Sequence, residues 1–281
     1  MYSITNNLTI DLNGHDIVSE LNNPLFSVSN GASLTLKGST GSVTNSGPIG
    51  HVTNNGFIVV EDGTYTSEVS TCFLADNGGS ITINDGLLTG AEGVVNTNAG
   101  NGIVIINGGD LVSEDKYVLA SDGTEGHGGN VFAINGGTLE GNTKSVGYEA
   151  AGIIIANNDT LVVNGGEITA NGGTAICMRA GSVTINDGTI IATDTDKSGN
   201  TVEDGAVGDD LTILTGCSAI VFHETSNYPG QLLGDMALTV TGGTITGINH
   251  SIQVLSNAAE PNVVVTGGTL TPVYPEVVVG E

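Results

Sequence analysis

The sequence predicts an all-β fold, a solenoid of about ten short-stranded coils, on three observations. One phrase recurs along the chain, its copies are spaced almost regularly, and no helical stretch interrupts them. The phrase reads apolar-x-apolar, then Asn or Thr, then Gly or Asp, then Gly, as in Ile81–Gly86. Self-similarity with a period of about 20 to 50 residues is typical of repeat architectures, so we expect residues 1–281 to form a single domain.

The spacing of the phrase predicts coils of three strands each. Close copies begin at Ile81, Val104, Phe132, Leu161, Val183, Leu238 and Val263, and looser copies lie at 8–14, 34–38 and 58–63. From Gly63 to Gly188 the last glycines of successive copies are 22 to 29 residues apart, which suits three strands of about four or five residues with their corners. The next step, from Gly188 to Gly243, is 55 residues, which predicts one coil with a long acidic insertion at about 192–210.

Each copy carries the signals of a strand, a corner and two further strands. Apolar side chains two residues apart share one face of a strand and can point into the coil. The Gly-Gly or Asp-Gly pair accommodates positive φ angles at the corner. A second strand follows at once, as in Thr244–Thr246, and a third follows later. We expect third strands at Ala150–Ile155, Thr174–Met178, Ala219–Phe222 and Ser251–Leu255.

This pattern resembles the single-stranded right-handed parallel β-helix, the architecture of pectate lyases, autotransporter stalks, phage tailspikes and many Gly-rich bacterial surface proteins. The likeness covers nearly the whole chain. It implies that each strand pairs in parallel with its equivalent in the next coil, at about 4.8 Å per step. The repeat encodes corners and not chemistry, so it is specific for the fold and weak for the function.

One corner position holds asparagine in five successive copies. Amide side chains repeated in this way can hydrogen-bond to one another along a stack, similar to the asparagine ladder of pectate lyase-like helices. A residue that recurs in every coil serves the stack and not a single site. We expect a structural ladder formed by Asn84, Asn107, Asn135, Asn164 and Asn186.

The charge balance excludes several partners. Thirty Asp and Glu stand against five Lys and Arg, so the formal net charge is −25. Nucleic-acid binding needs clustered Lys and Arg, and an anionic membrane surface would repel such a chain. No apolar run is long enough to span a bilayer, and Met1–Asp11 lacks the features of a secretion signal.

The three cysteines, Cys72, Cys177 and Cys217, lie beside apolar residues, and we interpret them as small buried hydrophobes.

The insertion contains a candidate calcium site. Oxygen-bearing residues at alternate positions followed by glycine resemble the first half of an EF-hand-type or dockerin-type loop. Position twelve is Gly205 where an EF-hand has Glu, and the open alternative is a solvated acidic loop. The candidate Ca²⁺ ligands are Asp194, Asp196, Ser198, Asn200 and, as the closing carboxylate, Glu203 or Asp204.

The fold resemblance makes a polysaccharide lyase or glycoside hydrolase the main alternative function. Lyase chemistry needs a basic side chain and calcium-binding carboxylates on one face, but Arg179 is the only arginine and the lysines are scattered. Gly126-His127-Gly128 and Asp209-Asp210 are similar to two polygalacturonase motifs, but they occur in the wrong order and the other two motifs are missing. We therefore expect no catalytic residues and interpret His127 as a solvated loop residue.

Threonine pairs after the corners suggest a further alternative, an ice-binding face. Threonine is also a good strand former at any outward position, which is the simpler explanation. The pairs are Thr64/Thr66, Thr244/Thr246 and Thr269/Thr271, and the acidic residues that interrupt the series are Asp110, Glu140 and Glu167.

These observations favour a non-catalytic structural or adhesive module. Insertions in solenoids gather on one face and commonly form the binding surface. We expect an extracellular location, on a phage particle or a bacterial cell surface, and a surface glycan or another particle or surface protein as the partner. Both ends of the repeat look uncapped, which favours a homo-oligomer or a larger assembly.

Overall fold

The structure, a computed structural model, describes residues 1–142, 151–171, 173–193, 218–222, 235–248, 250–254, 261–271 and 278–279. The regular structure in this part of the chain is β-strand throughout. No helix in it could cross a membrane. The strands form three parallel sheets, here named A, B and C, whose neighbours are every third strand in chain order.

Sheet A contains the strands that open each coil. They are β1 (Tyr2–Ile4), β4 (Phe26–Val28), β7 (Gly50–Val52), β10 (Thr71–Ala75), β13 (Gly93–Thr97), β16 (Leu119–Ser121), β19 (Ala151–Ile155), β22 (Thr174–Met178), β25 (Ile220–Phe222), β28 (Ile252–Val254) and β31 (Val278–Val279). The expected third strands correspond to β19, β22, β25 and β28 of this sheet.

Sheet B contains the strands of the repeated phrase. They are β2 (Leu8–Asp11), β5 (Ser33–Lys37), β8 (Phe57–Val60), β11 (Ser80–Ile83), β14 (Ile103–Ile106), β17 (Val131–Ile134), β20 (Thr160–Val163), β23 (Gly181–Ile185), β26 (Met236–Val240) and β29 (Asn262–Val265).

Sheet C contains the strands that follow the glycine corner. They are β3 (Ile17–Ser19), β6 (Ser42–Asn45), β9 (Thr64–Ser67), β12 (Leu87–Gly90), β15 (Asp110–Ser113), β18 (Thr138–Gly141), β21 (Glu167–Ala170), β24 (Thr189–Ala192), β27 (Thr244–Thr246) and β30 (Thr269–Thr271).

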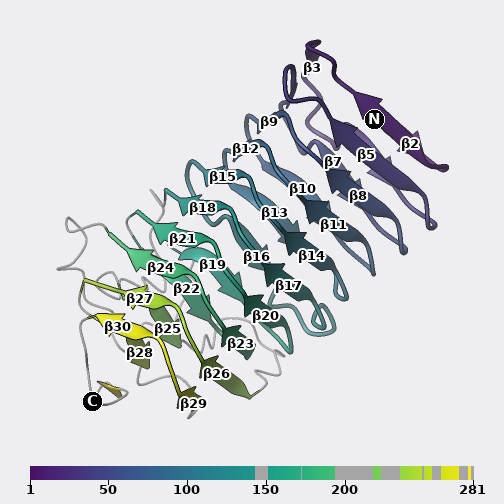
Figure 1. The fold of residues 1–281 in the computed structure, drawn as a ribbon. Helices are drawn as coiled ribbons and strands as arrows, with labels where there is room; N and C mark the ends of the chain where they lie inside the picture. The colour runs from purple at the N-terminus through teal and green to yellow at the C-terminus, as the bar shows by residue number, and fades with distance from the viewer. Residues whose placement is uncertain are drawn as a thin grey trace.

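The three sheets wind into one rod. The described strands make ten successive triplets, from β1–β3 to β28–β30, so the chain completes about nine turns between the first and the last. Figure 1 shows the coils stacked from the purple N-terminal end to the yellow C-terminal end. The predicted all-β parallel solenoid is confirmed. Parallel crossovers within one sheet are right-handed in almost all proteins, so right-handed winding stays our prediction for this chain.

The core lies inside the coil and follows the strand alternation. In β11, Ile81 and Ile83 are fully buried, while Thr82 between them points outward. Each fully buried aliphatic or aromatic side chain of this kind stabilises the fold by about 1.5–3 kcal/mol. The equivalent residues of neighbouring strands stack above one another in register, and this inner column is Leu34, Ile58, Ile81, Val104, Phe132, Leu161, Val183 and Leu238.

The corner glycines between sheets B and C behave as predicted. All eight have positive φ, between 81° and 113°, which side chains with a Cβ rarely adopt. Each stacks directly on the corner of the previous coil, and a Cβ at Gly137 would lie 2.6 Å from the carbonyl oxygen of Gly109. The corner therefore requires glycine for two separate reasons. The eight residues are Gly63, Gly86, Gly109, Gly137, Gly166, Gly188, Gly243 and Gly268.

The 55-residue step is a single coil, as predicted. Between β24 and β27, the described residues contain only β25 and β26, which join sheets A and B. Most of the extra chain separates Ala192 from Ile220, so the predicted insertion lies between sheets C and A. The candidate calcium ligands Asp194, Asp196, Ser198, Asn200, Glu203 and Asp204 lie outside the described residues.

Two of the cysteines are confirmed as buried. Cys72 and Cys177 are free thiols inside the protein, and burial raises the pKa of Cys72 to about 12 and that of Cys177 to about 11. Cys177 belongs to a second apolar cluster, on the outer side of sheet A, with Ile154 and Val221. Sheet A is thus buried on both sides in this region, which explains its continuous apolar runs. Cys217 lies outside the described residues.

Candidate functional site

The outer side of sheet B carries two long uncharged columns of side chains. Two columns of outward residues run in register along it, one on each side of the inner column that begins at Leu34. The next outward position, at the corner, holds Lys37 after Leu36, Glu61 after Val60 and then the asparagines from Asn84 onward. From β5 to β29 neither column contains a charged residue, in a chain whose net charge is −25. We call these residues the neutral face. They are Ser33, Phe57, Ser80, Ile103, Val131, Thr160, Ser182, Ala237 and Asn262, with Thr35, Val59, Thr82, Ile105, Ala133, Val162, Thr184, Thr239 and Val264.

The neutral face is apolar and accessible from β8 to β17. Phe57, Ile103 and Val131 occupy the same strand position in nearby coils and are 47%, 39% and 42% exposed. Val59 and Ile105 lie in the adjoining column, next to Thr82. Exposed apolar residues that gather on one flat surface mark interaction sites more often than single exposed residues do.

The predicted asparagine ladder borders this face and is confirmed. Each Nδ2 donates to the Oδ1 of the asparagine one coil earlier, with distances of 2.8–2.9 Å along the whole series from Asn186 to Asn84. The first amide, Asn84, donates to a carboxylate oxygen of Glu61 at 2.8 Å, and Thr241 donates to Asn186 at 3.0 Å. The side chains point outward at the corner. Because every bond runs the same way, the amide dipoles reinforce one another.

We expect Asn164→Ala to lower the free energy of unfolding by about 1 kcal/mol, because it removes two side-chain hydrogen bonds at a partly solvated site. Asn158→Ala is the matched control, since Asn158 is an exposed asparagine of the same coil outside the ladder. Urea denaturation measures both. Equal midpoints for the two variants would show that the ladder adds nothing to stability.

A second, shorter ladder at the corner that follows sheet C was not predicted. Asn171 donates to Asn142 Oδ1 and to Glu140 Oε1, both at 2.8 Å, and Thr193 donates to Asn171 at 2.6 Å. Asn142, Asn171 and Thr193 directly follow β18, β21 and β24, the strands of sheet C in three successive coils. The sequence signal is a polar residue directly after each of these strands, outside the recurring phrase.

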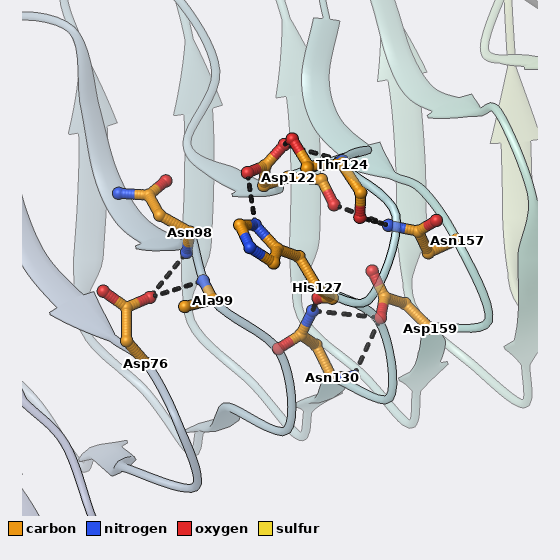
Figure 2. A network of polar contacts seen from close by, with 9 residues as sticks. All are labelled: Asp76, Asn98, Ala99, Asp122, Thr124, His127, Asn130, Asn157 and Asp159. Atoms are coloured by element: carbon orange, nitrogen blue, oxygen red, sulfur yellow. Dashed lines mark hydrogen bonds and ion pairs between the residues drawn. The ribbon is translucent and has the colours of Figure 1, made fainter. Parts of the chain in front are cut away.

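The corners between sheets A and B contain a network of buried and half-buried polar groups (Figure 2). Asp76 Oδ1 accepts hydrogen bonds from the backbone N–H groups of Asn98 (2.6 Å) and Ala99 (3.0 Å) in the following coil. Its other oxygen lies 2.9 Å from Nε2 of His51 in the preceding coil. Asp76 thus connects three successive coils.

The loop 122–130 carries an aspartate–histidine pair. Asp122 Oδ2 lies 2.7 Å from His127 Nδ1, and Asp122 Oδ1 accepts from the backbone and hydroxyl of Thr124 at 2.8 Å each. Burial raises the pKa of Asp122, but the hydrogen bonds from His127 and Thr124 outweigh it and the pKa is lowered. His127, expected as a solvated loop residue, is half-buried and held in place by this pair.

Asp159 is the most deeply enclosed carboxyl of the network. Its Oδ1 accepts from the backbone N–H and the side-chain amide of Asn130, at 2.8 Å and 3.0 Å. Its Oδ2 is buried and has no hydrogen-bond partner among the described residues. Burial raises the pKa of Asp159 to about 6, although the Ser121 hydroxyl and the donors of Asn130 and Gly129 oppose the shift. Asn130 also donates to the carbonyl of His127, so the loop and the next coil are joined.

This network connects successive coils to one another. Asp159 is fully buried, so a polysaccharide could not reach its proton. Arg179 is also buried, at 3% exposure. No group of three or more His, Cys, Asp or Glu in the described part of the chain could hold a metal ion. Sequence reasoning missed Asp76, Asn130 and Asp159, because these corners differ in length and have no periodic signal.

The threonine pairs lie on the outer side of sheet C, in the predicted outward positions. Thr64 and Thr66 pair with Leu87 and Thr89 of the next coil. Further along the sheet, Asp110, Glu140 and Glu167 occupy the same two columns, so acidic residues break the series in three successive coils. Sheet C therefore has a charged outer side, in contrast to sheet B.

No family model matches this chain, and no curated protein and no solved structure matches it.

Proposed function

We propose that the chain is a non-catalytic structural or adhesive module, displayed on a phage particle or a bacterial surface, which binds its partner through the neutral face of sheet B. The observation that carries the proposal is the absence of charge on this face in a chain of net charge −25. Two columns that stay uncharged over nine strands of a highly acidic protein are adapted to contact another surface, since solvent exposure alone would favour charged residues there, as at the neighbouring Lys37 and Glu61.

The polar groups outside this face support a structural role. The asparagine ladder, the carboxylate of Asp76 and the pair of Asn130 with Asp159 each connect one coil to the next. Internal hydrogen bonds of this kind stiffen a rod and leave few groups free for chemistry. A stiff rod with one flat binding face suits a surface protein that holds a glycan or a neighbouring protein at a fixed distance.

The alternative function, a polysaccharide lyase or glycoside hydrolase, is favoured by one observation. Asp122 with lowered pKa and Asp159 with raised pKa are two carboxyls with opposed shifts, the pattern found in acid–base catalysis. The burial of Asp159 opposes this function, because a general acid must reach the glycosidic oxygen.

Incubation with acidic and neutral polysaccharides, with polygalacturonate, cellulose and chitin as probes, separates the two functions. We expect neither new reducing ends nor unsaturated products above a heat-denatured control. Products that the wild-type protein forms and the Asp122→Asn variant does not would overturn the non-catalytic proposal, because that variant removes the charge that holds His127.

A further inference from the structure

We propose that the partner of the neutral face is a second copy of this chain, so that two rods pack sheet B against sheet B in an isologous dimer. The inference rests on the proposed function of this face in binding and adds the identity of the occupant. In an isologous dimer the same patch faces itself across a two-fold axis, so the patch must be compatible with its own chemistry.

Charge is the first reason for a second copy. Two chains of net charge −25 repel each other, and any interface that paired acidic surfaces would be penalised. On sheet C, a self-contact would bring Asp110, Glu140 and Glu167 close to the acidic residues of the other copy. The neutral face avoids this, because two copies can join there while their carboxylates remain in solvent.

The size and shape of the face are the second reason. Its nine strands extend about 38 Å along the rod at about 4.8 Å per step. The ladder column widens the face to about 13 Å over the last seven strands, from Asn84 to Thr266, whereas Lys37 and Glu61 occupy the ladder position in the first two coils and lie outside the patch. Such a patch buries about 450 Å² on each copy, or about 900 Å² in total, which is close to the lower limit of about 1,000 Å² for a specific interface. Two sheets packed face to face lie about 10 Å apart, a geometry that flat columns of side chains permit.

The side chains of the face are the third reason. Between β8 and β17 it contains Phe57, Ile103 and Val131 as exposed apolar residues, with threonine and serine around them. A glycan would be expected to stack on exposed aromatic rings, and Phe57 is the only aromatic residue of the face. Aliphatic and threonine side chains in regular columns are the usual filling between two packed sheets.

Sedimentation velocity on the whole chain tests the proposal with a matched pair of variants. Thr82 and Thr89 are half-buried, outward-pointing threonines of the same coil. Thr82 lies on sheet B between Val59 and Ile105, whereas Thr89 lies on sheet C. We expect the wild-type protein to reach a mass twice 28.2 kDa as its concentration rises. Thr82→Glu should raise the dissociation constant by about a hundredfold or more, because it buries an unpaired charge on each side of the interface. Thr89→Glu should leave the dissociation constant unchanged.

Salt adds an independent readout. Raising the ionic strength from about 0.01 M to about 0.15 M shortens the range of charge repulsion from about 30 Å to about 8 Å, so the wild-type dimer should tighten. Circular dichroism melts of both variants separate a lost interface from a lost fold.

If the wild-type protein stays monomeric at both salt concentrations, the partner of the neutral face is not a second copy of this chain. The proposal is also wrong if Thr82→Glu and Thr89→Glu raise the dissociation constant of the dimer equally. Such a result leaves the non-catalytic function standing, because the polysaccharide incubation tests that separately. Conversely, a dimer that is sensitive to Thr82→Glu and also cleaves polysaccharides keeps this inference and removes the proposed function.

Discussion

Gly137→Ala is expected to lower the free energy of unfolding by about 3 to 5 kcal/mol. Two effects add at this corner. The backbone has a φ of 86°, which alanine adopts at a cost of about 1–2 kcal/mol. In addition, the new Cβ would lie 2.6 Å from the carbonyl oxygen of Gly109, so the corners of two coils would have to separate. Urea denaturation monitored by circular dichroism measures the loss.

Gly126→Ala is the matched control for this prediction. Gly126 has nearly the same φ, 85°, but a Cβ at this position would meet no atom within 4 Å apart from its chain neighbours. We expect Gly126→Ala to show the conformational cost alone, about 1–2 kcal/mol. Equal losses for the two variants would mean that close stacking of the corners does not restrict this position to glycine.

The pH dependence of stability should change markedly in Asp159→Asn. The folded-state pKa of Asp159 is raised from 3.8 to about 6, so the fold favours the protonated carboxyl. The stability that this protonated form contributes is fully present below pH 3.8 and is lost as the pH rises through 6. Above that pH, wild-type protein holds an ionised carboxylate in a buried site, which destabilises it by up to about 3 kcal/mol. At pH 8 the variant should therefore be the more stable protein, and at pH 4 the two should be close.

Asp122→Asn provides a control of opposite sign. The pKa of Asp122 is lowered, so its carboxylate stabilises the fold above its ordinary pKa and this stability is lost as the pH falls. We expect Asp122→Asn to be less stable than wild type at pH 7 and to approach it at low pH. Melting temperatures across pH 4 to 8 report both effects. If the wild-type protein is more stable than Asp159→Asn at pH 8, the buried ionised carboxylate of Asp159 does not destabilise the fold and this prediction is wrong.

The regular part of this fold could be predicted from the sequence because it repeats. The apolar-x-apolar strands, the corner glycines and the ladder from Asn84 to Asn186 recur at one position of each copy, and a stack requires the same geometry at every step. Local sequence and tertiary contact therefore carry the same signal, and the structure has the expected strands, φ angles and hydrogen bonds.

The candidate site could be predicted only in part. The corners between sheets A and B vary in length, so nothing in the sequence indicates that Asn130 and Asp159 meet across 29 residues. The neutral face had a readable signal, since the residue between the two apolar positions of each phrase is uncharged in every copy from Leu34 onward. Recognising it required comparing outward positions between copies, whereas the strand prediction used the inward ones. The calcium hypothesis stays a prediction, because its residues lie outside the described part of the chain.

Hydroxyl-radical footprinting as a function of protein concentration tests the binding role of the neutral face most directly. Phe57 on sheet B and Leu87 on sheet C are exposed to similar extents, 47% and 41%, and serve as probe and control in one sample. We expect oxidation of Phe57, Ile103 and Val131 to fall as the concentration rises, while oxidation of Leu87 stays constant. Constant oxidation of all four residues, or a fall confined to Leu87, would contradict the assignment of sheet B as the binding face.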